Sequence, residues 1–420
     1  MRKSLTLAAA GALLAGCNGG IGNAPVVPGA AAPQAIAAAQ STQGTIVRSC
    51  AKPLPGDHFR CLAEFRADLA LDPMHKRKHP PLPSGYGPSQ LQSAYSLPSS
   101  TNGSGQTVAI VDAYNDPNAA SDLAVYRSEY GLTACTTASG CFQQVSQTGS
   151  KTSLPKNNGG WAEEESLDMD MVSAICPNCK IILVEANSAT VANLEKAEDE
   201  AVALGANVVT NSYGGSEYAA SDPAYSHSGV AIVASAGDDG YAEGSMQPCS
   251  FASVVCAGGT SLTQADNARG WSEVVWNDSY GATGSGCSSE VSKPSWQTDK
   301  GCAKRSQSDA SFDADPATGV AVYDSYAYEG YEGWLVFGGT SVASPSLASV
   351  FALAGNASSL GPDAAQPIWN DAGTGLNSVT SGDNGSCPSS IEYICTAGTG
   401  TDGVYSGPAG WGTPDGISDF

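Results

Sequence analysis

The stretch Gly338-Gly339-Thr340-Ser341-Val342-Ala343-Ser344-Pro345 carries more information than any other part of the chain. Its glycines permit a sharp backbone turn, and the small residues after them predict a helix that begins near Ser341. Free backbone N–H groups and the helix dipole favour negative charge at such a helix start. Ser341 is therefore a candidate nucleophile, and an ordinary helix cap is the alternative interpretation.

A serine nucleophile needs a neighbouring base, and the four histidines of the chain are poorly placed to provide one. His58, His75 and His79 precede the first strand-like segment of the main domain, and His227 lies in a turn-rich stretch. Either the chain is not a hydrolase, or its base is another type of residue.

A carboxylate is the candidate base. Leu167, Met171 and Ile175 recur at helical spacing and predict a helix with one buried stripe. Glu164 and Asp168 are four residues apart and share the neighbouring stripe. Two carboxyl groups held together in a partly dry cleft share a proton, so Glu164 could accept the serine proton with Asp168 behind it. The alternative is a solvated, acidic helix start.

Together these motifs resemble those of the sedolisins, serine-carboxyl peptidases with a subtilisin-like fold. The family's marks are Glu-x-x-x-Asp on a helix, a Gly-Asp loop after a central strand, and a late Ser-x-x-x-Pro. Here they stand at Glu164–Asp168, at Gly237-Asp238 and at Ser341–Pro345. Further similar strings are Asn211-Ser212-Tyr213-Gly214, Val275-Trp276-Asn277, Pro294-Ser295-Trp296-Gln297 and Ala314-Asp315-Pro316-Ala317-Thr318-Gly319. The resemblance extends over residues 84–420.

The resemblance implies a role for each residue at these marks. Ser341 would be the nucleophile, Glu164 the general base, Asp168 its partner, and Asp238 the acid of the oxyanion hole. Asp238 can fill that role only when protonated, because an ionised carboxylate has no proton to donate. A low pH favours that state, so we expect an acidic optimum. The alternative for Asp238 is an ordinary surface turn.

The leading functional interpretation is an endopeptidase that acts by acyl transfer on a peptide or protein substrate. One alternative is a peptide-binding surface lipoprotein on the same fold with little catalysis, and another is a structural envelope lipoprotein. Fold resemblance alone does not separate these functions.

The composition suits one large, loop-rich domain. The chain has 420 residues, of which 41% are hydrophobic, 14% are charged and 49 are glycine. Its formal net charge of -22 argues against a nucleic-acid partner, whose phosphates it would repel. We expect a monomer.

The N-terminus reads as a lipoprotein signal. Arg2-Lys3 precedes a short apolar run, and Leu14-Ala15-Gly16 stands directly before Cys17. Residues 1–16 would be the signal peptide, and a lipid on Cys17 would anchor the protein in a membrane of the bacterial cell envelope, periplasmic or on the outer surface. The Gly-, Ala- and Pro-rich residues 17–44 would form a flexible tether. A plain signal peptide with a chance cysteine is the alternative.

Cysteine spacing also favours export. Without Cys17, twelve of the 13 cysteines remain, and they fall into close sequence pairs that predict six small disulfide loops. The pairs are Cys50/Cys61, Cys135/Cys141, Cys176/Cys179, Cys249/Cys256, Cys287/Cys302 and Cys387/Cys395. Cys176 and Cys179 also have the spacing of a redox or zinc motif, but no second Cys-x-x-Cys completes a zinc set, so a structural disulfide is favoured.

The order of elements predicts an α/β fold, namely a subtilisin-like parallel sheet with helices on both faces. The strand-like runs are 108–111, 181–184, 208–211 and 230–234, with 254–256 as a further candidate, and the helix-like runs are 119–130, 163–175 and 191–204. Residues 265–336 are rich in Gly, Ser and Asp and predict long loops over the site.

The sedolisin-like peptidase domain would span residues 84–420. Residues 45–83 form a short preceding segment, too short for the large prodomain that the resemblance implies.

The resemblance also implies a Ca²⁺ ion near the C-terminus, held by two aspartates and backbone carbonyls. Ser378 and Gly412 stand where those aspartates would be. Because Ca²⁺ needs anionic oxygen ligands, we expect no calcium and no other cofactor, unless Asp383, Asp402 or Asp415 compensates.

Overall fold

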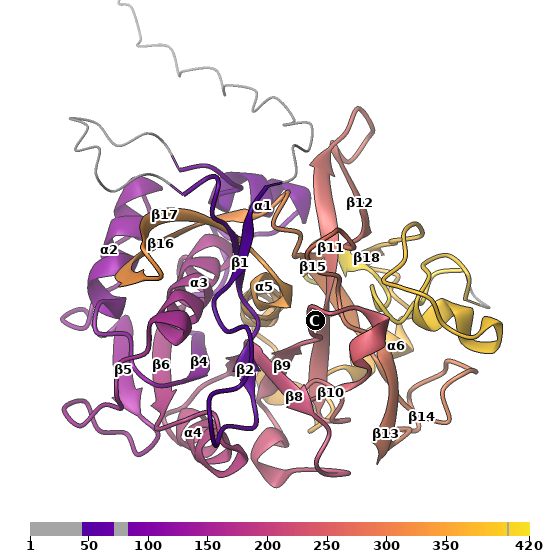
Figure 1. The fold of residues 1–420 in the computed structure, drawn as a ribbon, viewed down its shortest axis with the longest axis horizontal. Coiled ribbons are helices and arrows are strands. Elements are labelled where there is room, and N and C mark those ends of the chain that lie inside the picture. Colours follow the sequence, from indigo (N-terminus) through magenta and orange to yellow (C-terminus); the bar gives the residue numbers. More distant parts are fainter. Residues whose placement is uncertain (1–43, 71–82, 401–402) are drawn as a thin grey trace, which may run out of the picture. The chain divides into compact units, whose positions relative to one another are not determined.

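A mostly parallel sheet forms the centre of the structure, a computed structural model that describes residues 44–70, 83–400 and 403–420. Eight strands make up this sheet, and β12 runs antiparallel to β11 while β15 pairs with β11 off the main path (Figure 1). In spatial order the strands are β12 (Trp271–Val275), β11 (Val254–Gln264), β9 (Ala231–Ser235), β7 (Val208–Asn211), β4 (Thr107–Ala113), β6 (Lys180–Ala186) and β5 (Phe142–Ser146), and the strand off the path is β15 (Ala310–Asp313).

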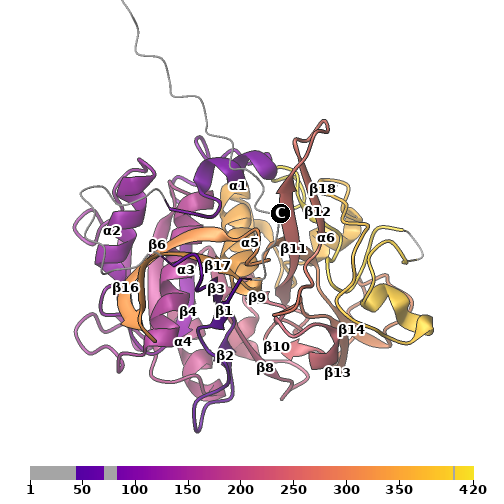
Figure 2. The ribbon, with the colours of Figure 1, turned by 45° about the horizontal axis from the view of Figure 1, so that its top comes forward.

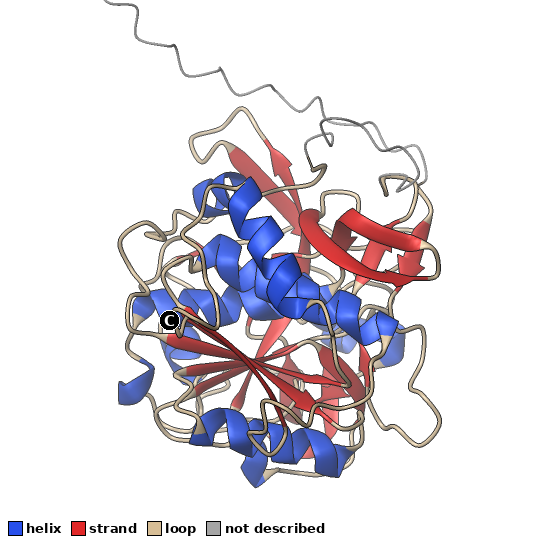
Figure 3. Ribbon diagram, turned by 90° about the vertical axis from the view of Figure 1, so that its left-hand side faces the viewer, coloured by secondary structure: helices blue, strands red, loops and turns tan. Residues whose placement is uncertain are grey.

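Helices cover both faces of this sheet (Figure 3). The described helices are α1 (Pro88–Ala94), α2 (Ala119–Glu129), α3 (Gly159–Ile175), α4 (Val191–Ala203), α5 (Thr340–Ala354) and α6 (Gln366–Asn370), with short 3₁₀ turns at Pro223–Tyr225, Tyr241–Glu243, Ala357–Ser359 and Ser389–Ile394. Successive residues of β4 face opposite sides of the sheet and therefore belong to two different hydrophobic cores. Val108 and Ile110 pack in the core that includes α3 and α5, whereas Ala109 and Val111 pack in the core that includes α4. The predicted fold class and its helix–strand alternation are confirmed.

The prediction of long loops over residues 265–336 is wrong. That stretch contains β12 and β15 together with β13 (Gly286–Ser292), β14 (Lys304–Gln307), β16 (Val320–Tyr328) and β17 (Tyr331–Gly338). Strands β16 and β17 form an antiparallel hairpin whose Val320, Val322, Leu335 and Phe337 are buried. The high glycine and serine content of this stretch led to the loop prediction. Its strands are instead held by backbone hydrogen bonds to neighbouring strands, which composition does not reveal.

Residues 44–70 belong to the same compact unit as the residues after them. They form β1 (Ile46–Arg48), β2 (Arg60–Cys61) and β3 (Glu64–Arg66). Strands β1 and β3 extend the β16–β17 hairpin, and β2 joins a second small sheet with β8 (Tyr213–Ser216) and β10 (Met246–Gln247). Near the C-terminus, β18 (Leu376–Asn377) pairs with β19 (Thr413–Pro414).

All six predicted disulfides are present, including Cys176–Cys179. Cys17, the predicted signal in residues 1–16 and the predicted tether up to residue 43 lie outside the described residues. In the part of the chain that is described, no helix combines the length and hydropathy that spanning a bilayer requires.

Candidate active site

Ser341 lies in the first turn of α5, as the sequence predicts. The helix begins at Thr340, with Gly339 before it at a φ of 89°. A Cβ atom on Gly339 would lie 2.1 Å from the backbone oxygen of Leu62 and 2.9 Å from Oδ2 of Asp238, so only glycine fits here. The Ser341 side chain is buried, and its Oγ donates a long hydrogen bond of 3.4 Å to the backbone oxygen of Ser212.

Helix α3 carries the predicted acidic pair into the core. Asn158 caps its start by accepting a hydrogen bond from Trp161 N at 3.1 Å, and every residue from Gly160 to Ile175 is buried. The alternative of a solvated acidic helix start is therefore wrong. Burial raises the pKa of Glu164, and the nearby carboxyl of Asp168 raises it further.

Ser212 connects the pair to the nucleophile. Its Oγ donates to Oδ1 of Asp168 at 2.7 Å, while its backbone oxygen accepts from Ser341. Oε2 of Glu164 accepts the backbone N–H of Leu62 at 2.9 Å. The hydroxyl of Ser341 also lies close enough to the Glu164 carboxyl to lower its pKa by hydrogen bonding, against the larger effect of burial. Helices α3 and α5 thus place Glu164, Asp168 and Ser341 in one buried site.

Asp238 follows β9 and reaches the same site. Its Oδ1 accepts both the N–H and the hydroxyl of Thr340 at 2.8 Å, whereas its buried Oδ2 has no hydrogen-bond partner among the described residues. Burial raises the pKa of Asp238 to about 7, against the opposing effects of the Thr340 hydrogen bonds and of Arg60. One oxygen accepts and the other is free to carry a proton, as an oxyanion-hole acid requires.

Sequence reasoning missed Asp112, at the carboxyl end of β4. Its side chain is fully buried, and neither of its oxygens has a hydrogen-bond partner in the described chain. Burial and the charges of Asp168 and Glu164 raise its pKa, which places it beside the acidic pair. A signal was available, because an acid at the carboxyl end of a buried parallel strand lies at the edge of the sheet where active sites gather.

The residues near the C-terminus do not fit the calcium ion that the family resemblance implies. A Cβ on Gly412 would lie 2.3 Å from the backbone oxygen of Asn377, so close packing occupies the space that a carboxylate would need. Within residues 44–70, 83–400 and 403–420, one group of three carboxylates is close enough together to hold a metal ion. It consists of Asp116, Asp122 and Asp324, which are not the residues at the expected calcium position. The expected absence of calcium stays a prediction.

Comparisons with known proteins agree with this architecture. No protein-family model matches the chain. Kumamolisin from Bacillus sp. (strain MN-32) is 29% identical over 332 residues, which cover 72% of this chain and 57% of kumamolisin. Sedolisin from Pseudomonas sp. (strain 101) is 28% identical over 367 residues, which cover 79% of this chain and 60% of sedolisin. The chain therefore spans about three fifths of the length of these relatives.

A solved structure extends the similarity to three dimensions. Pseudomonas sedolisin, a serine-carboxyl proteinase complexed with two molecules of pseudo-iodotyrostatin, superposes with a TM-score of 0.65 at 27% identity, covering 80% of this chain and 96% of that one. The chain thus has a subtilisin-like α/β fold, similar to that of this serine-carboxyl proteinase. Sequence and structure together support the sedolisin family for this chain, as the motifs predict.

Proposed function

We propose that this protein is an endopeptidase of the serine-carboxyl type. The observation that carries the proposal is the convergence of Ser341, Glu164, Asp168 and Asp238 in one buried site, with Oδ2 of Asp238 left free beside Gly339. A structural core has no need to bury four such groups around a helix start, because each buried polar group without a partner costs stability.

In the proposed reaction, Oγ of Ser341 attacks the carbonyl carbon of a peptide bond and its proton passes to Glu164. The carbonyl oxygen becomes negative and accepts a hydrogen bond from protonated Asp238, near the positive end of the α5 dipole. Glu164 then gives the proton to the leaving amine, and water hydrolyses the acyl-enzyme by the reverse sequence. Asp168, held by Ser212, supports Glu164 and shares the charge of the pair.

The pH dependence follows from Asp238. Its pKa of about 7 means that it holds its proton in acid and loses it above neutrality, so activity should be highest at acid pH. The substrate is a peptide or an unfolded protein segment, and the enzyme works as a monomer.

The proposal includes export. Six disulfides suit an oxidising compartment, and the sequence Leu14-Ala15-Gly16-Cys17 suits lipid attachment at Cys17 in the bacterial envelope. The anchor itself lies outside the described residues.

The test is hydrolysis of denatured casein from pH 3 to pH 8 by the wild type and by Ser341→Ala, together with labelling by an active-serine probe. Any hydrolysis that the wild type shows and the variant lacks supports the proposal, whatever its rate. Equal product formation by both proteins would contradict it.

A further inference from the structure

Ser212 lies between the end of β7 and the start of β8 and holds several groups of the proposed active site. Its Oγ donates to Oδ1 of Asp168 at 2.7 Å. Its backbone oxygen accepts from Oγ of Ser341 at 3.4 Å and from the N–H of Leu62 at 3.2 Å. The orientation of this one residue therefore decides whether the acidic pair and the nucleophile stay aligned.

Side chains around Ser212 alternate between the two faces of the sheet. Thr210 and Ser212 face α3 and α5, and Oγ1 of Thr210 shares a hydrogen bond of 2.8 Å with Oγ of Ser344 on α5. Tyr213 packs in the hydrophobic core on the other face, which includes α4. Asn211 also faces α4, because it alternates with Thr210 and Ser212. Figures 1 and 2 show α3 beside α5, with α4 apart from both.

The amide of Asn211 ties together the two residues that flank Ser212. Its Oδ1 accepts from the hydroxyl of Tyr213 at 2.7 Å, which joins the residue before Ser212 to the residue after it. Its Nδ2 donates to the backbone oxygen of Val233 at 3.2 Å, which fixes the pair to β9. Both side chains are fully buried. We call these two hydrogen bonds the Asn211 clamp. They hold Ser212 from the face of the sheet opposite the catalytic groups.

The Asn211 clamp lies in a core that is otherwise largely apolar. Val209, two residues earlier on the same face, packs in that core, and an apolar side chain at position 211 would avoid the cost of burying an amide. The fully buried Glu198 of α4 lies nearby: burial raises its pKa, and the Asn211 amide opposes this effect. Polar groups are therefore kept in this core at a cost, and the partners of Asn211 identify Ser212 as the residue that they hold in place.

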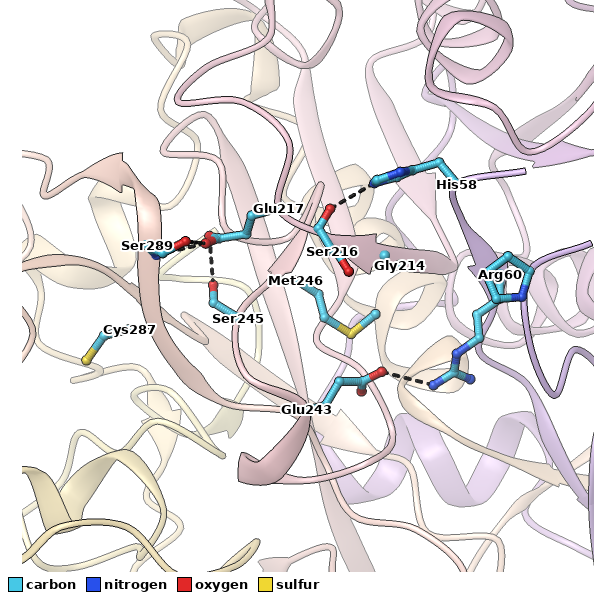
Figure 4. A pocket seen from close by; sticks show the side chains of 12 residues that line it. His58, Arg60, Gly214, Ser216, Glu217, Glu243, Ser245, Met246, Cys287 and Ser289 are labelled. Atoms are coloured by element: carbon cyan, nitrogen blue, oxygen red, sulfur yellow. Dashed lines mark hydrogen bonds and ion pairs between the residues drawn. The ribbon is translucent and has the colours of Figure 1, made fainter. Parts of the chain in front are cut away.

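The Asn211 clamp is separate from the open space beside the site. Strand β8 continues from Tyr213 to Gly214, which borders a cavity of about 490 Å³ together with Glu243 and Met246 (Figure 4). Asn211 and Tyr213 are not among the residues that border it. Substitutions of their side chains therefore leave the wall of the cavity unchanged, and we expect them to affect kcat rather than KM.

We propose that Asn211 is a positioning residue of the active site: it holds Ser212 through Tyr213, and Ser212 in turn keeps Asp168 and Ser341 aligned. The proposal rests on the proposed function for its effect on hydrolysis. Its effect on Asp168 is measured without catalysis, so the two can fail separately.

Four variants test the Asn211 clamp. Asn211→Ala removes it, and Tyr213→Phe removes one of its hydrogen bonds at the loss of a single hydroxyl. Tyr225→Phe is the matched control, because it removes a hydroxyl 3.0 Å from that of Tyr213 and leaves the bond between Tyr213 and Asn211 intact. Asn211→Asp is the conservative variant, since in acid its protonated carboxyl accepts from Tyr213 and donates to Val233 as the amide does. Circular dichroism and thermal melting select the variants that fold.

Hydrolysis of denatured casein at acid pH is the first measurement. We expect Asn211→Ala and Tyr213→Phe to lower kcat at least about tenfold while KM stays within about twofold. Tyr225→Phe and Asn211→Asp should keep kcat within about twofold of the wild type. Because Asn211 acts through Ser212, Asn211→Ala should lower kcat much less in a Ser212→Ala background than in the wild type.

The protonation of Asp168 is the second measurement and needs no substrate. Burial raises the pKa of Asp168, and the hydrogen bond from Ser212 lowers it. Glu164 on α3 and Asp112 on β4 are the charged groups that face it. Infrared difference spectroscopy against pH follows the protonated carboxyl band that Asp168→Asn removes, and Ser212→Ala should raise the apparent titration midpoint of that band.

Asn211→Ala and Tyr213→Phe should raise the same midpoint, whereas Tyr225→Phe should leave it in place. A raised midpoint without hydrolysis by any protein, the wild type included, would uphold the Asn211 clamp and contradict the proposed function. Wild-type kcat and an unchanged midpoint in folded Asn211→Ala and Tyr213→Phe would overturn the clamp and leave the function standing. A lower kcat with an unchanged midpoint would also overturn it, because Asn211 would then not act through Ser212.

Discussion

Thr340 gives both its N–H and its hydroxyl to the same oxygen of Asp238, each at 2.8 Å, and leaves the other oxygen of that carboxyl unpaired and buried. Both hydrogen bonds favour the ionised form and lower the pKa of Asp238, whereas burial raises it more strongly, to about 7. The balance between these effects determines at which pH the proposed oxyanion donor loses its proton.

Thr340→Val removes the hydroxyl but keeps the backbone N–H. Losing one of the two hydrogen bonds that favour the carboxylate raises the pKa of Asp238, so the alkaline limb of kcat/KM should move to higher pH. Thr340→Ser keeps the hydroxyl and is the control. An alkaline limb that stays in place in Thr340→Val would show that another group sets it.

Asp238→Asn gives a donor that does not titrate. An amide donates a weaker hydrogen bond than a carboxylic acid, so kcat should fall, by less than the roughly 10²–10³-fold expected for complete loss of an oxyanion donor. The difference in kcat/KM between the wild type and Asp238→Asn should become smaller as pH rises. Measurements of kcat/KM for both proteins between pH 3 and pH 8 check this. A wild-type optimum at pH 8 or above would rule out a neutral acid at this position.

Ser341→Ala and Glu164→Gln should each lower kcat by at least about 10³-fold, because one removes the nucleophile and the other the proton acceptor. Both variants should keep the wild-type melting temperature within a few degrees. Glu163→Gln and Glu165→Gln are the matched controls on the same buried helix, and we expect them to retain most of the activity. A Glu164→Gln variant as active as these controls would disprove the assignment of the base.

Stability should decrease as pH rises, because several buried carboxyls hold protons in the folded state. Burial raises the pKa of Asp116 and of Asp324 to about 8, against about 3.9 for an unfolded aspartate. Each group's stabilising contribution is complete below the unfolded value and is lost as pH rises through the folded value. The melting temperature should therefore fall between about pH 4 and pH 8, and Asp324→Asn should flatten that fall. A melting temperature that rises over this range would contradict the prediction.

Calcium should not stabilise the protein, since Ser378 and Gly412 supply no carboxylate. A bound ion selective for the folded state would raise the melting temperature with its concentration. We expect equal melting temperatures in excess chelator and in millimolar calcium. A rise of several degrees would contradict this, and its loss in Asp324→Asn would locate the ion at the acidic cluster of Asp116, Asp122 and Asp324.

Motifs local in sequence were predictable, whereas contacts between distant segments were not. Glu164 and Asp168 share a helical stripe, Ser341 follows its own glycines, and each disulfide joins sequence neighbours, so short-range spacing was sufficient. Asp112 joins the site only because β4 ends beside α3, and Leu62 only because β2 pairs with β8. Strand pairing over such separations depends on the whole fold and leaves little trace in composition.

The Cys50–Cys61 disulfide lies entirely on the N-terminal side of the Leu62–Ala63 peptide bond. The described disulfides therefore do not link residues up to 62 with residues from 63 onward. As long as this bond is intact, the contact between residues up to 62 and the rest of the chain is intramolecular and does not depend on protein concentration. Hydrolysis of the bond would make the two parts a bimolecular complex, whose occupancy depends on concentration and on a dissociation constant. Residues up to 62, including the ring that the disulfide closes, would then leave as a separate fragment when the sample is diluted.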